Sequence, residues 1–267
     1  MKPDRSIKPE RSLLRTLLEY PGSHYENVDD PSVTFKRRET IHSKPFLHAI
    51  YREWYNLQAA HIPTVSGEIL EIGSGAGFFQ ELYPESFSSE VFFCPFVQAI
   101  VDGMDLPFPP ASLRAVVMTD VFHHIPNVER FLRETVRTLT PGGRIIMIEP
   151  WVTGWSRWVM DHFHSEPMDV DMKTWQFPST GPLSGSNQAL PWIVFKRDKE
   201  IFETRFSDLE IVTVQPFMPF RYLLSGGVSS RALAPSWANG LLKGFEKSFN
   251  PQKWAMFALI IIQKRRI

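Results

Sequence analysis

The chain has 267 residues, with 29 lysine plus arginine against 29 aspartate plus glutamate, and a single cysteine. The balanced charge does not indicate a nucleic-acid binder, whose domain is usually basic, and Cys94 alone cannot form an internal disulfide. The N-terminal residues are charged and polar, unlike a signal peptide, and the longest late apolar run, 254–262, is too short to span a bilayer. We therefore expect a cytoplasmic protein without a transmembrane segment, with peripheral membrane contact left open.

One or two helices are expected before the first strand. Apolar residues recur at near-helical intervals between residues 34 and 60, and Pro45 would start or kink a helix there. We assign residues 1–66 to an N-terminal helical cap.

The most informative stretch is 67–77, Gly-Glu-Ile-Leu-Glu-Ile-Gly-Ser-Gly-Ala-Gly. A short apolar strand ends there in a glycine-rich turn, and an amphipathic segment over 78–85 predicts a helix. A strand, a tight glycine turn and a helix begin a nucleotide-binding α/β unit. The glycines allow close approach of the backbone to a ligand.

The spacing of the glycines and one carboxylate indicate the kind of ligand. A dinucleotide fingerprint, G-x-G-x-x-G, would place its third glycine where Phe78 stands, whereas here it comes one residue early at Gly77. Glu71, two residues before the first glycine, would repel a pyrophosphate but suits a cation.

The E-x-G-x-G-x-G arrangement resembles the first motif of class I S-adenosylmethionine-dependent methyltransferases. Segments 101–108, 115–125 and 139–150 resemble later motifs of that family in the same order, and 115–125 is close to the type 11, or ubiquinone-biosynthesis, subgroup. The resemblance covers residues 67–150. It implies an α/β fold with a Rossmann-like, mostly parallel seven-stranded sheet that ends in an antiparallel hairpin, and S-adenosyl-L-methionine as the cofactor.

The resemblance also implies which residues contact the cofactor. The acid at 102 would accept a hydrogen bond from the adenine amino group, and the acid at 120 would face the methionine part or the substrate, unless it serves as a helix N-cap. The expected cofactor-binding residues are Glu71, Gly73, Ser74, Gly75, Gly77, Asp102, Gly103 and Asp120.

One departure from the family concerns the second strand, which we expect over 90–96. The family usually ends this strand with an acid that binds the ribose hydroxyls, but Cys94 or Pro95 stands near that place. The ribose contact is then expected from backbone groups or from another segment.

Methyl transfer is an in-line displacement in which positioning and exclusion of water matter most, and a base is needed only if the nucleophile must lose a proton. His123 and His124 follow the fourth strand and are the candidate bases, with a packing role as the alternative. Glu149 ends the fifth strand and either holds substrate or forms a surface salt bridge. No metal is expected, because the two histidines of Asp-His-Phe-His, 161–164, point in different directions on a helix.

After the core over 67–150 we expect an inserted aromatic lid over 151–197, and a C-terminal part of the core over 198–267 with a second insertion at about 216–250. Trp151, Trp155 and Trp158 recur at i, i+4 and i+7, which predicts one stripe on a helix. The stripe either packs the lid on the domain or, with Tyr222, faces the substrate.

The sequence thus predicts an S-adenosylmethionine-dependent methyltransferase acting on a small-molecule or lipid-like acceptor, apolar or aromatic in character. Two alternatives stay open: a non-catalytic protein that binds the same cofactor, and a nucleotide-dependent oxidoreductase on the same topology.

Overall fold

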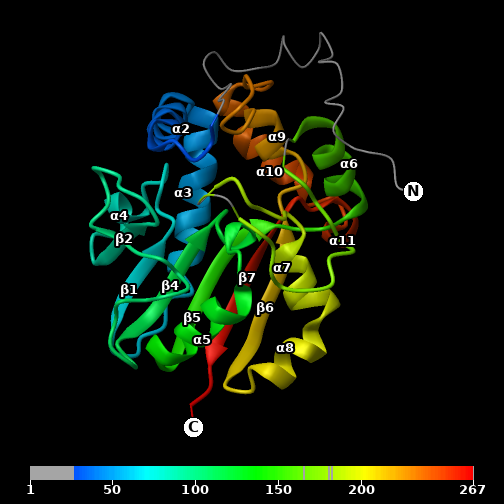
Figure 1. Cartoon of the computed structure of the whole chain (residues 1–267). Helices are drawn as coiled ribbons and strands as arrows, with labels where there is room; N and C mark the ends of the chain where they lie inside the picture. Colours follow the sequence, from blue (N-terminus) through cyan, green and yellow to red (C-terminus); the bar gives the residue numbers. More distant parts are fainter. Residues whose placement is uncertain (1–26, 165, 180, 182, 267) are drawn as a thin grey trace.

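The computed structural model describes residues 27–164, 166–179, 181 and 183–266. At its centre lies a seven-stranded sheet in the order β3-β2-β1-β4-β5-β7-β6 (Figure 1). The strands are β1 (Glu68–Ile72), β2 (Ser86–Glu90), β3 (Ala99–Ile100), β4 (Leu113–Thr119), β5 (Leu139–Pro150), β6 (Leu209–Phe217) and β7 (Phe257–Lys264). Only β7 runs antiparallel to its neighbours β5 and β6. The predicted Rossmann-like sheet with a final antiparallel hairpin is confirmed.

Two apolar cores, one on each face of the sheet, hold the central strands in place. Alternate residues point to opposite faces of a strand, and along β4 Val116 and Met118 join one core while Ala115 and Val117 join the other. The first core includes side chains of α5 (Val128–Thr138) and α8 (Lys199–Arg205), and the second includes those of α3 (Pro45–Ala59). Burial on both faces explains the apolar runs in β4, over 145–148 of β5 and in β7.

The N-terminal helices begin and end where the sequence predicts. The side chain of Asp30 caps α2 (Pro31–Ser43) by accepting a hydrogen bond from the Ser32 N–H. Pro45 is the first residue of α3, where its missing N–H costs nothing. Figure 1 shows α2 beyond the end of the sheet where β1, β4 and β5 terminate, and α3 running from there along one face of the sheet. Residues 1–26 of the expected cap lie outside the described residues.

The second strand differs from the prediction. It spans Ser86–Glu90 and pairs in parallel with β1, Ile69 opposite Ser86, so the expected strand over 90–96 is wrong. The apolar residues after it form an irregular loop instead, in which Phe93 is 67% exposed and the Val97 N–H donates to the Cys94 carbonyl. The loop reaches β3 without a helix, as its short length predicts.

The first crossover helix is also shorter than predicted. The helix expected over 78–85 is reduced to α4 (Phe79–Leu82), which is followed by a turn in which the Ser86 N–H donates to the Tyr83 carbonyl. Pro84 in this turn cannot continue a helix.

The two predicted insertions carry the remaining helical segments. The first holds α6 (Gly154–Phe163), α7 (Leu190–Trp192) and the π-helix η2 (Ile193–Arg197), and the second holds α9 (Arg221–Ser225), η3 (Ser236–Ala238) and α10 (Asn239–Glu246), followed by α11 (Pro251–Trp254). Figure 1 shows α6, α9 and α10 at the same end of the sheet as α2. In the part of the chain that the structure describes, every helix is too short or too polar to cross a lipid bilayer.

Candidate active site

The glycine turn after β1 has the backbone conformation that its glycines predict. Gly73 and Gly75 adopt positive φ angles of 67° and 36°, which side-chain-bearing residues rarely adopt. A Cβ atom at Gly73 would lie 2.5 Å from a Val121 methyl carbon, and one at Gly75 would lie 2.9 Å from a Glu90 carboxylate oxygen. The turn therefore has no room for side chains at these two positions.

Helices α2 and α3 cover the far side of this turn. The Tyr55 hydroxyl accepts a hydrogen bond from the Phe78 N–H at 3.2 Å, and a side chain at Gly77 would collide with that hydroxyl. Arg38 donates to the Gly77 carbonyl and pairs with Glu81. These contacts fix the N-terminal helices against the predicted cofactor-binding turn.

Glu71 and Ser74 form a buried pair beside the turn. The Ser74 hydroxyl donates to a Glu71 carboxylate oxygen at 2.7 Å, and both residues are buried. Burial raises the pKa of the Glu71 carboxyl to about 7, although the bond from Ser74 opposes the shift and the nearby Glu90 adds to it. A cation bound in the turn would favour the ionised form of this group.

A second acid, Glu90, lies on the opposite side of the turn, and the sequence prediction missed it. Because β2 ends at Glu90, the position where the family places its ribose-binding acid holds a carboxylate after all. Burial raises its pKa to about 7, against the lowering effect of hydrogen bonds from the Val91 and Gly75 N–H groups. The sequence predicts Glu90 as the first residue of the second strand, whereas it is the last. A correctly placed strand end would have identified Glu90 as the acid expected there.

Asp102 and Gly103 follow β3 as predicted. The Asp102 carboxylate is exposed and accepts a hydrogen bond from the Met104 N–H at 2.8 Å. Gly103 is buried, and a Cβ atom there would touch Phe131 at 3.4 Å. The acid thus stands at the surface while the small residue beside it packs against α5.

Asp120 directly follows β4 and has an unusual backbone conformation. Its φ angle is 62°, in the left-handed region, and its N–H donates to the Ile148 carbonyl of β5. Desolvation of the Asp120 carboxyl group raises its pKa to about 6. The charge of His123 opposes this shift, while the charges of Glu149 and Glu166 add to it. Strained residues concentrate at functional sites, and Asp120 lies at the carboxyl edge of the sheet, where ligands of α/β proteins bind.

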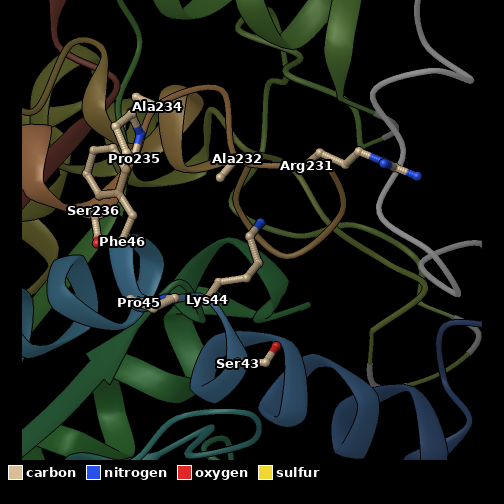
Figure 2. A pocket seen from close by; sticks show the side chains of 9 residues that line it. All are labelled: Ser43, Lys44, Pro45, Phe46, Arg231, Ala232, Ala234, Pro235 and Ser236. Atoms are coloured by element: carbon tan, nitrogen blue, oxygen red, sulfur yellow. The ribbon is translucent and has the colours of Figure 1, made fainter.

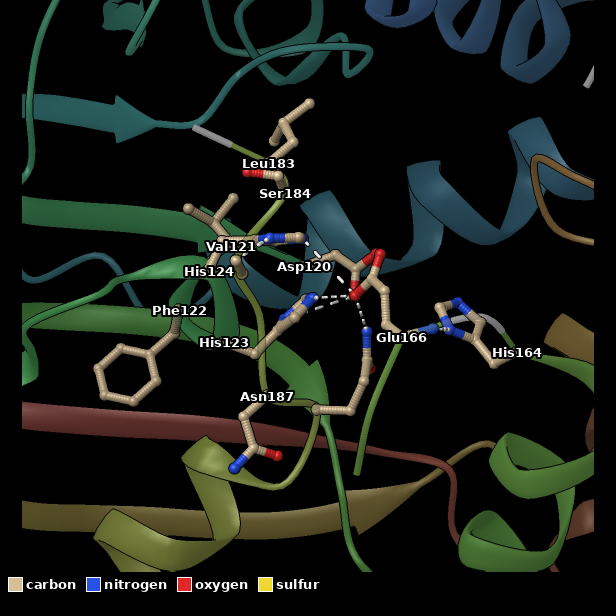
Figure 3. Close-up of polar contacts among 12 residues, drawn as sticks. Asp120, Val121, Phe122, His123, His124, His164, Glu166, Leu183, Ser184 and Asn187 are labelled. Carbon is tan, nitrogen blue, oxygen red and sulfur yellow. Dashed lines mark hydrogen bonds and ion pairs between the residues drawn. The ribbon is translucent and has the colours of Figure 1, made fainter. Parts of the chain in front are cut away.

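His123 lies between the carboxylates of Glu149 and Glu166, and Figure 3 shows it beside Glu166. Its Nδ1 is 2.8 Å from a Glu149 oxygen, and its Nε2 is 3.5 Å from a Glu166 oxygen. Burial alone would lower the pKa of His123, but the hydrogen bonds and charges of the two acids raise it well above its usual value. The two acids thus favour the protonated form of this buried imidazole.

Glu149 is a buried residue that holds the backbone of the site in place. It is fully buried, and its other oxygen accepts hydrogen bonds from the Val121 and Phe122 N–H groups at 2.8 and 2.7 Å. The carboxylate thereby fixes the backbone that leads from β4 into η1 (Phe122–His124). The surface salt bridge expected as its alternative role is wrong, because the ion pair that it forms with His123 is internal.

His124 differs from its neighbour in charge. Its Nδ1 lies 3.1 Å from the Gly185 carbonyl, so Nδ1 carries the proton and Nε2 the lone pair. Nε2 is 3.8 Å from a Glu166 oxygen. Burial first, and then the charge of His123, lower the pKa of His124 to about 4, so it is neutral at physiological pH.

Glu166 completes this cluster from the first insertion. The same oxygen accepts a hydrogen bond from Gln188 at 2.6 Å, and the charge of His123 keeps the pKa of the carboxyl group well below its usual value despite burial. Donor atoms of His123, His124 and Glu166 lie within 4.8 Å of one another, a set that includes ligand types suited to a transition metal. His162 of α6 and His164, which directly follows α6, do not belong to this group of possible metal ligands. His162 contacts the Trp158 carbonyl instead.

The predicted aromatic stripe is divided between the core and the surface. Trp151 precedes α6 and is 3% exposed within a core cluster, so the expected stripe of three tryptophans on one helix is wrong. Trp155 donates to the Pro219 carbonyl at 2.7 Å and stacks on Trp158. Tyr222 stacks on Trp54 of α3, and burial, Tyr51 and Asp120 raise the pKa of its hydroxyl. The charge of Asp120 thus affects the pKa of Tyr222, whereas Trp151 belongs to the core.

A pocket of about 340 Å³ lies where α2 meets α3, away from the glycine turn (Figure 2). Lys44 is directed into it, but its ammonium donates to the Gly227 and Ser230 carbonyls, and burial lowers its pKa to about 8. The pocket thus includes a lysine that ties the second insertion to the N-terminal helices. Its lining residues are Ser43, Lys44, Pro45, Phe46, Arg231, Ala232, Ala234, Pro235 and Ser236.

Comparison with known proteins agrees with this geometry. Residues 70–147 match the family described as "Methyltransferase domain", type 11. The chain is 40% identical over 45 residues to a demethylmenaquinone methyltransferase of Tropheryma whipplei, and 39% identical over 46 residues to the 27-O-demethylrifamycin SV methyltransferase of Amycolatopsis mediterranei. Each match covers 17% of this chain, and 19% and 17% of the respective relative, so the chain spans less than a fifth of the length of these relatives.

Solved structures extend the likeness of the fold to nearly the whole chain. An S-adenosylmethionine-dependent methyltransferase from Thermotoga maritima, described as a possible histamine N-methyltransferase, has a TM-score of 0.50 at 18% identity, covering 87% of this chain and 99% of its own. A chain of the complex between the Haloferax volcanii Trm112 methyltransferase activator and the putative methyltransferase also has a TM-score of 0.50, at 13% identity, covering 91% and 100%. The sheet order, the glycine turn and these matches together identify residues 70–147 as a class I S-adenosylmethionine-dependent methyltransferase domain of type 11.

Proposed function

We propose that this chain transfers the methyl group of S-adenosylmethionine to a small apolar or aromatic acceptor that carries an ionisable hydroxyl. The observation that supports this most directly is the shared edge of the sheet: β1 leads into the glycine turn, β2 ends at Glu90, and β4 is followed by Asp120 and the histidine pair. A cofactor seat and a group able to accept a proton therefore adjoin each other.

The residues of the turn fit this cofactor. Gly73 and Gly75 allow the tight backbone bend that would approach the cofactor, and Glu71 with Ser74 would supply a carboxylate beside it. In this proposal Glu90 accepts hydrogen bonds from the ribose hydroxyls. Asp102 with Gly103 receives the adenine, and Asp120 faces the ammonium group of the methionine part.

Bound S-adenosylmethionine supplies a methyl group made electrophilic by its sulfonium. His124 would accept the proton of the acceptor hydroxyl at Nε2 while the oxygen lone pair attacks the methyl carbon and the carbon–sulfur bond breaks toward sulfur. The Gly185 carbonyl fixes the imidazole tautomer, and the Glu166 carboxylate would stabilise the imidazolium that forms. His123 is a positioning residue, because it pairs with both Glu149 and Glu166 and so would hold the Glu166 carboxylate in place.

The acceptor class rests on the side chains across from the histidines and on the relatives. Tyr51 and Tyr222 lie near enough to Asp120 for their pKa values to respond to its charge, and they would form an aromatic wall. The two relatives are named for a demethylated menaquinone and a demethylated rifamycin. We therefore expect a hydroxylated ring compound, with an aromatic or quinol ring, as the acceptor.

The test is formation of S-adenosylhomocysteine from S-adenosylmethionine with a panel of hydroxylated quinols and aromatic ring compounds. His124→Asn should lower turnover by about a hundredfold or more and leave cofactor affinity unchanged. The acidic limb of the kcat profile should lie near the His124 pKa of about 4 rather than near the Asp120 value of about 6. Full activity of His124→Asn would refute the assignment of the base, and cofactor binding without turnover of any acceptor would favour the non-catalytic alternative.

A further inference from the structure

An exposed apolar stripe runs along η3 and α10, on the second insertion. Trp237, Leu241 and Phe245 are spaced at i, i+4 and i+8, and their exposed fractions are 76%, 71% and 55%. This spacing places the three side chains on one side of a helix. Large apolar side chains that gather on a surface mark an interaction site more often than scattered ones do.

The stripe is continuous with apolar side chains of α11 and α6. Ring centroids connect Phe245 to Phe249 at 4.9 Å, Phe249 to Trp254 at 5.5 Å, Trp254 to Trp155 at 5.7 Å, and Trp155 to Trp158 at 5.3 Å. Trp158 is itself 46% exposed. The apolar surface therefore extends over three helices rather than one.

The exposed charged residues of the segment that carries the stripe are of one sign. Segment 231–254 contains four basic residues, Arg231, Lys243, Lys247 and Lys253, all exposed, and a single acid, Glu246. Glu246 is 8% exposed, and its carboxylate is taken up by the Arg221 guanidinium and two backbone N–H groups. Although the whole chain is neutral, the exposed charge of this segment is entirely basic.

We propose that this face, defined by Trp237, Leu241 and Phe245 with Lys247 and Lys253, docks on an anionic lipid surface. Apolar side chains on a basic helical segment bury themselves at the boundary between headgroups and acyl chains, tryptophan is enriched at that depth, and lysines add attraction to anionic headgroups. A positive rim around an apolar stripe is complementary to such a membrane and not to a neutral one.

A neighbouring apolar pocket supports a lipid as the partner. It has a volume of about 250 Å³ and is lined mainly by Trp155, Phe220 and leucines of α9 and α10, with Phe245 of the stripe in its wall. An acyl chain or the apolar tail of a membrane-dissolved compound fits such a lining. The docking face would therefore place a lipid-accepting groove directly at the membrane.

The experiment is co-flotation of the full chain with vesicles of phosphatidylcholine alone and with phosphatidylglycerol added. Binding is expected to the anionic vesicles and should weaken as salt is raised. Trp237→Ser with Leu241→Ser should lower the apparent affinity about tenfold or more, because two apolar side chains are no longer buried. Lys247→Glu with Lys253→Glu should remove the preference for anionic lipid.

The matched control is Ile201→Ser with Val212→Ser. These residues are also apolar and exposed, at 44% and 45%, but they lie on α8 and β6, and α8 lies at the opposite end of the sheet from α10 (Figure 1). The control should bind vesicles as the unsubstituted chain does, and circular dichroism should show that all variants are folded. Absence of vesicle binding at low salt, or equal binding by the stripe variant, would overturn the proposal. So would a dimer in light scattering that the stripe variant abolishes without vesicle binding, because a second copy would then be the partner.

Discussion

Glu71 and Glu90 flank the glycine turn as two buried carboxyl groups, each with a pKa of about 7. Keeping two acids in a buried site is unfavourable for a protein without a ligand, since burial disfavours their charged forms. A cationic cofactor would reverse that preference. The two side chains thus make the turn selective for a positively charged ligand, and its affinity should depend on pH.

S-adenosylmethionine should bind more tightly as pH rises from 6 to 8. The free folded protein holds protons on Glu71 and Glu90 below about pH 7, and a bound cation favours their ionised forms, so binding releases protons in this window. We expect Kd to fall about tenfold between these limits. Calorimetry in two buffers of different ionisation enthalpy measures the released protons directly.

Glu90→Gln is the control for this assignment. It should weaken binding and remove part of the proton release, because one of the two titrating groups is gone. Its free energy of unfolding without cofactor should be higher than that of the unsubstituted chain at pH 8, by about 1–3 kcal/mol. The sign follows from the raised pKa of Glu90 in the folded state. Such a carboxyl group contributes stability at a pH below its pKa in the unfolded chain, and this contribution is lost as pH rises through 7. At pH 8 the unsubstituted chain therefore bears the cost of a buried charge that the glutamine avoids. A Kd independent of pH in both proteins would contradict the role of these acids.

The cluster of His123, His124 and Glu166 is expected to handle protons rather than a metal. The Glu166 oxygen that faces both imidazoles already accepts a hydrogen bond from Gln188 at 2.6 Å, so a metal ion bound at this oxygen would compete with that bond. Elemental analysis of the purified chain should find substoichiometric zinc and iron, and a chelator should leave its melting temperature unchanged. Stoichiometric metal that is lost in Glu166→Gln would show instead that the cluster is a metal centre.

At the scale of elements, the second insertion is fastened to the N-terminal helix α3 by buried polar contacts. Arg221 of α9 is 2% exposed and bridges Glu53 of α3, at 2.8 and 2.9 Å, to Glu246 of α10, at 2.6 Å. The sequence prediction placed Tyr222 near the substrate, and the structure uses the neighbouring Arg221 as a bridge between three helices.

Arg221→Met should lower the free energy of unfolding by about 3–5 kcal/mol, because it leaves the buried Glu246 carboxylate without its cationic partner and removes the bidentate contact to Glu53. Denaturant unfolding measures the loss. Lys243→Met is the control: its ammonium also pairs with Glu53, at 3.3 Å, but its side chain is 52% exposed, so its removal should cost well under about 1 kcal/mol. Equal losses for the two variants would contradict the bridging role of Arg221.

Elements with strong local signals were predictable, and those fixed by distant contacts were not. The turn at Gly73 and Gly75, and the start of α3 at Pro45, follow from residues whose backbone preferences are restricted. The end of β2 at Glu90 is set by pairing with β1, and the apolar residues after it gave a false strand signal. Local apolar content could not reveal that the strand stops one residue before this run.

The candidate site shows the same division. Glu71 and the histidine pair could be located by their place beside predicted strands, but the contacts of Glu166 could not. Glu166 comes from an irregular insertion and meets His123 only through the folded backbone. Likewise, the burial of Trp151 depends on β5 continuing to Pro150, which delays the start of α6 to Gly154.

At the scale of the whole molecule, one end of the sheet carries both chemistry and surface contacts. The glycine turn, the histidine cluster and the two insertions gather where β1, β4 and β5 end, while α8 and the C-terminus lie at the other end (Figure 1). The neutral net charge hides this asymmetry, because the basic segment 231–254 is balanced by acids elsewhere. A membrane-facing lid next to a cofactor seat would suit an acceptor that partitions into lipid.

The central claim, that the turn after β1 holds S-adenosylmethionine, is tested most directly by calorimetric titration with S-adenosylmethionine and S-adenosylhomocysteine. We predict saturable binding of one equivalent of each, abolished in Gly75→Arg, where a side chain would meet Glu90 at 2.9 Å, and retained in Gly154→Arg, where the space around Cβ is open. Failure of both ligands to bind the unsubstituted chain, or undiminished binding by Gly75→Arg, would contradict the account.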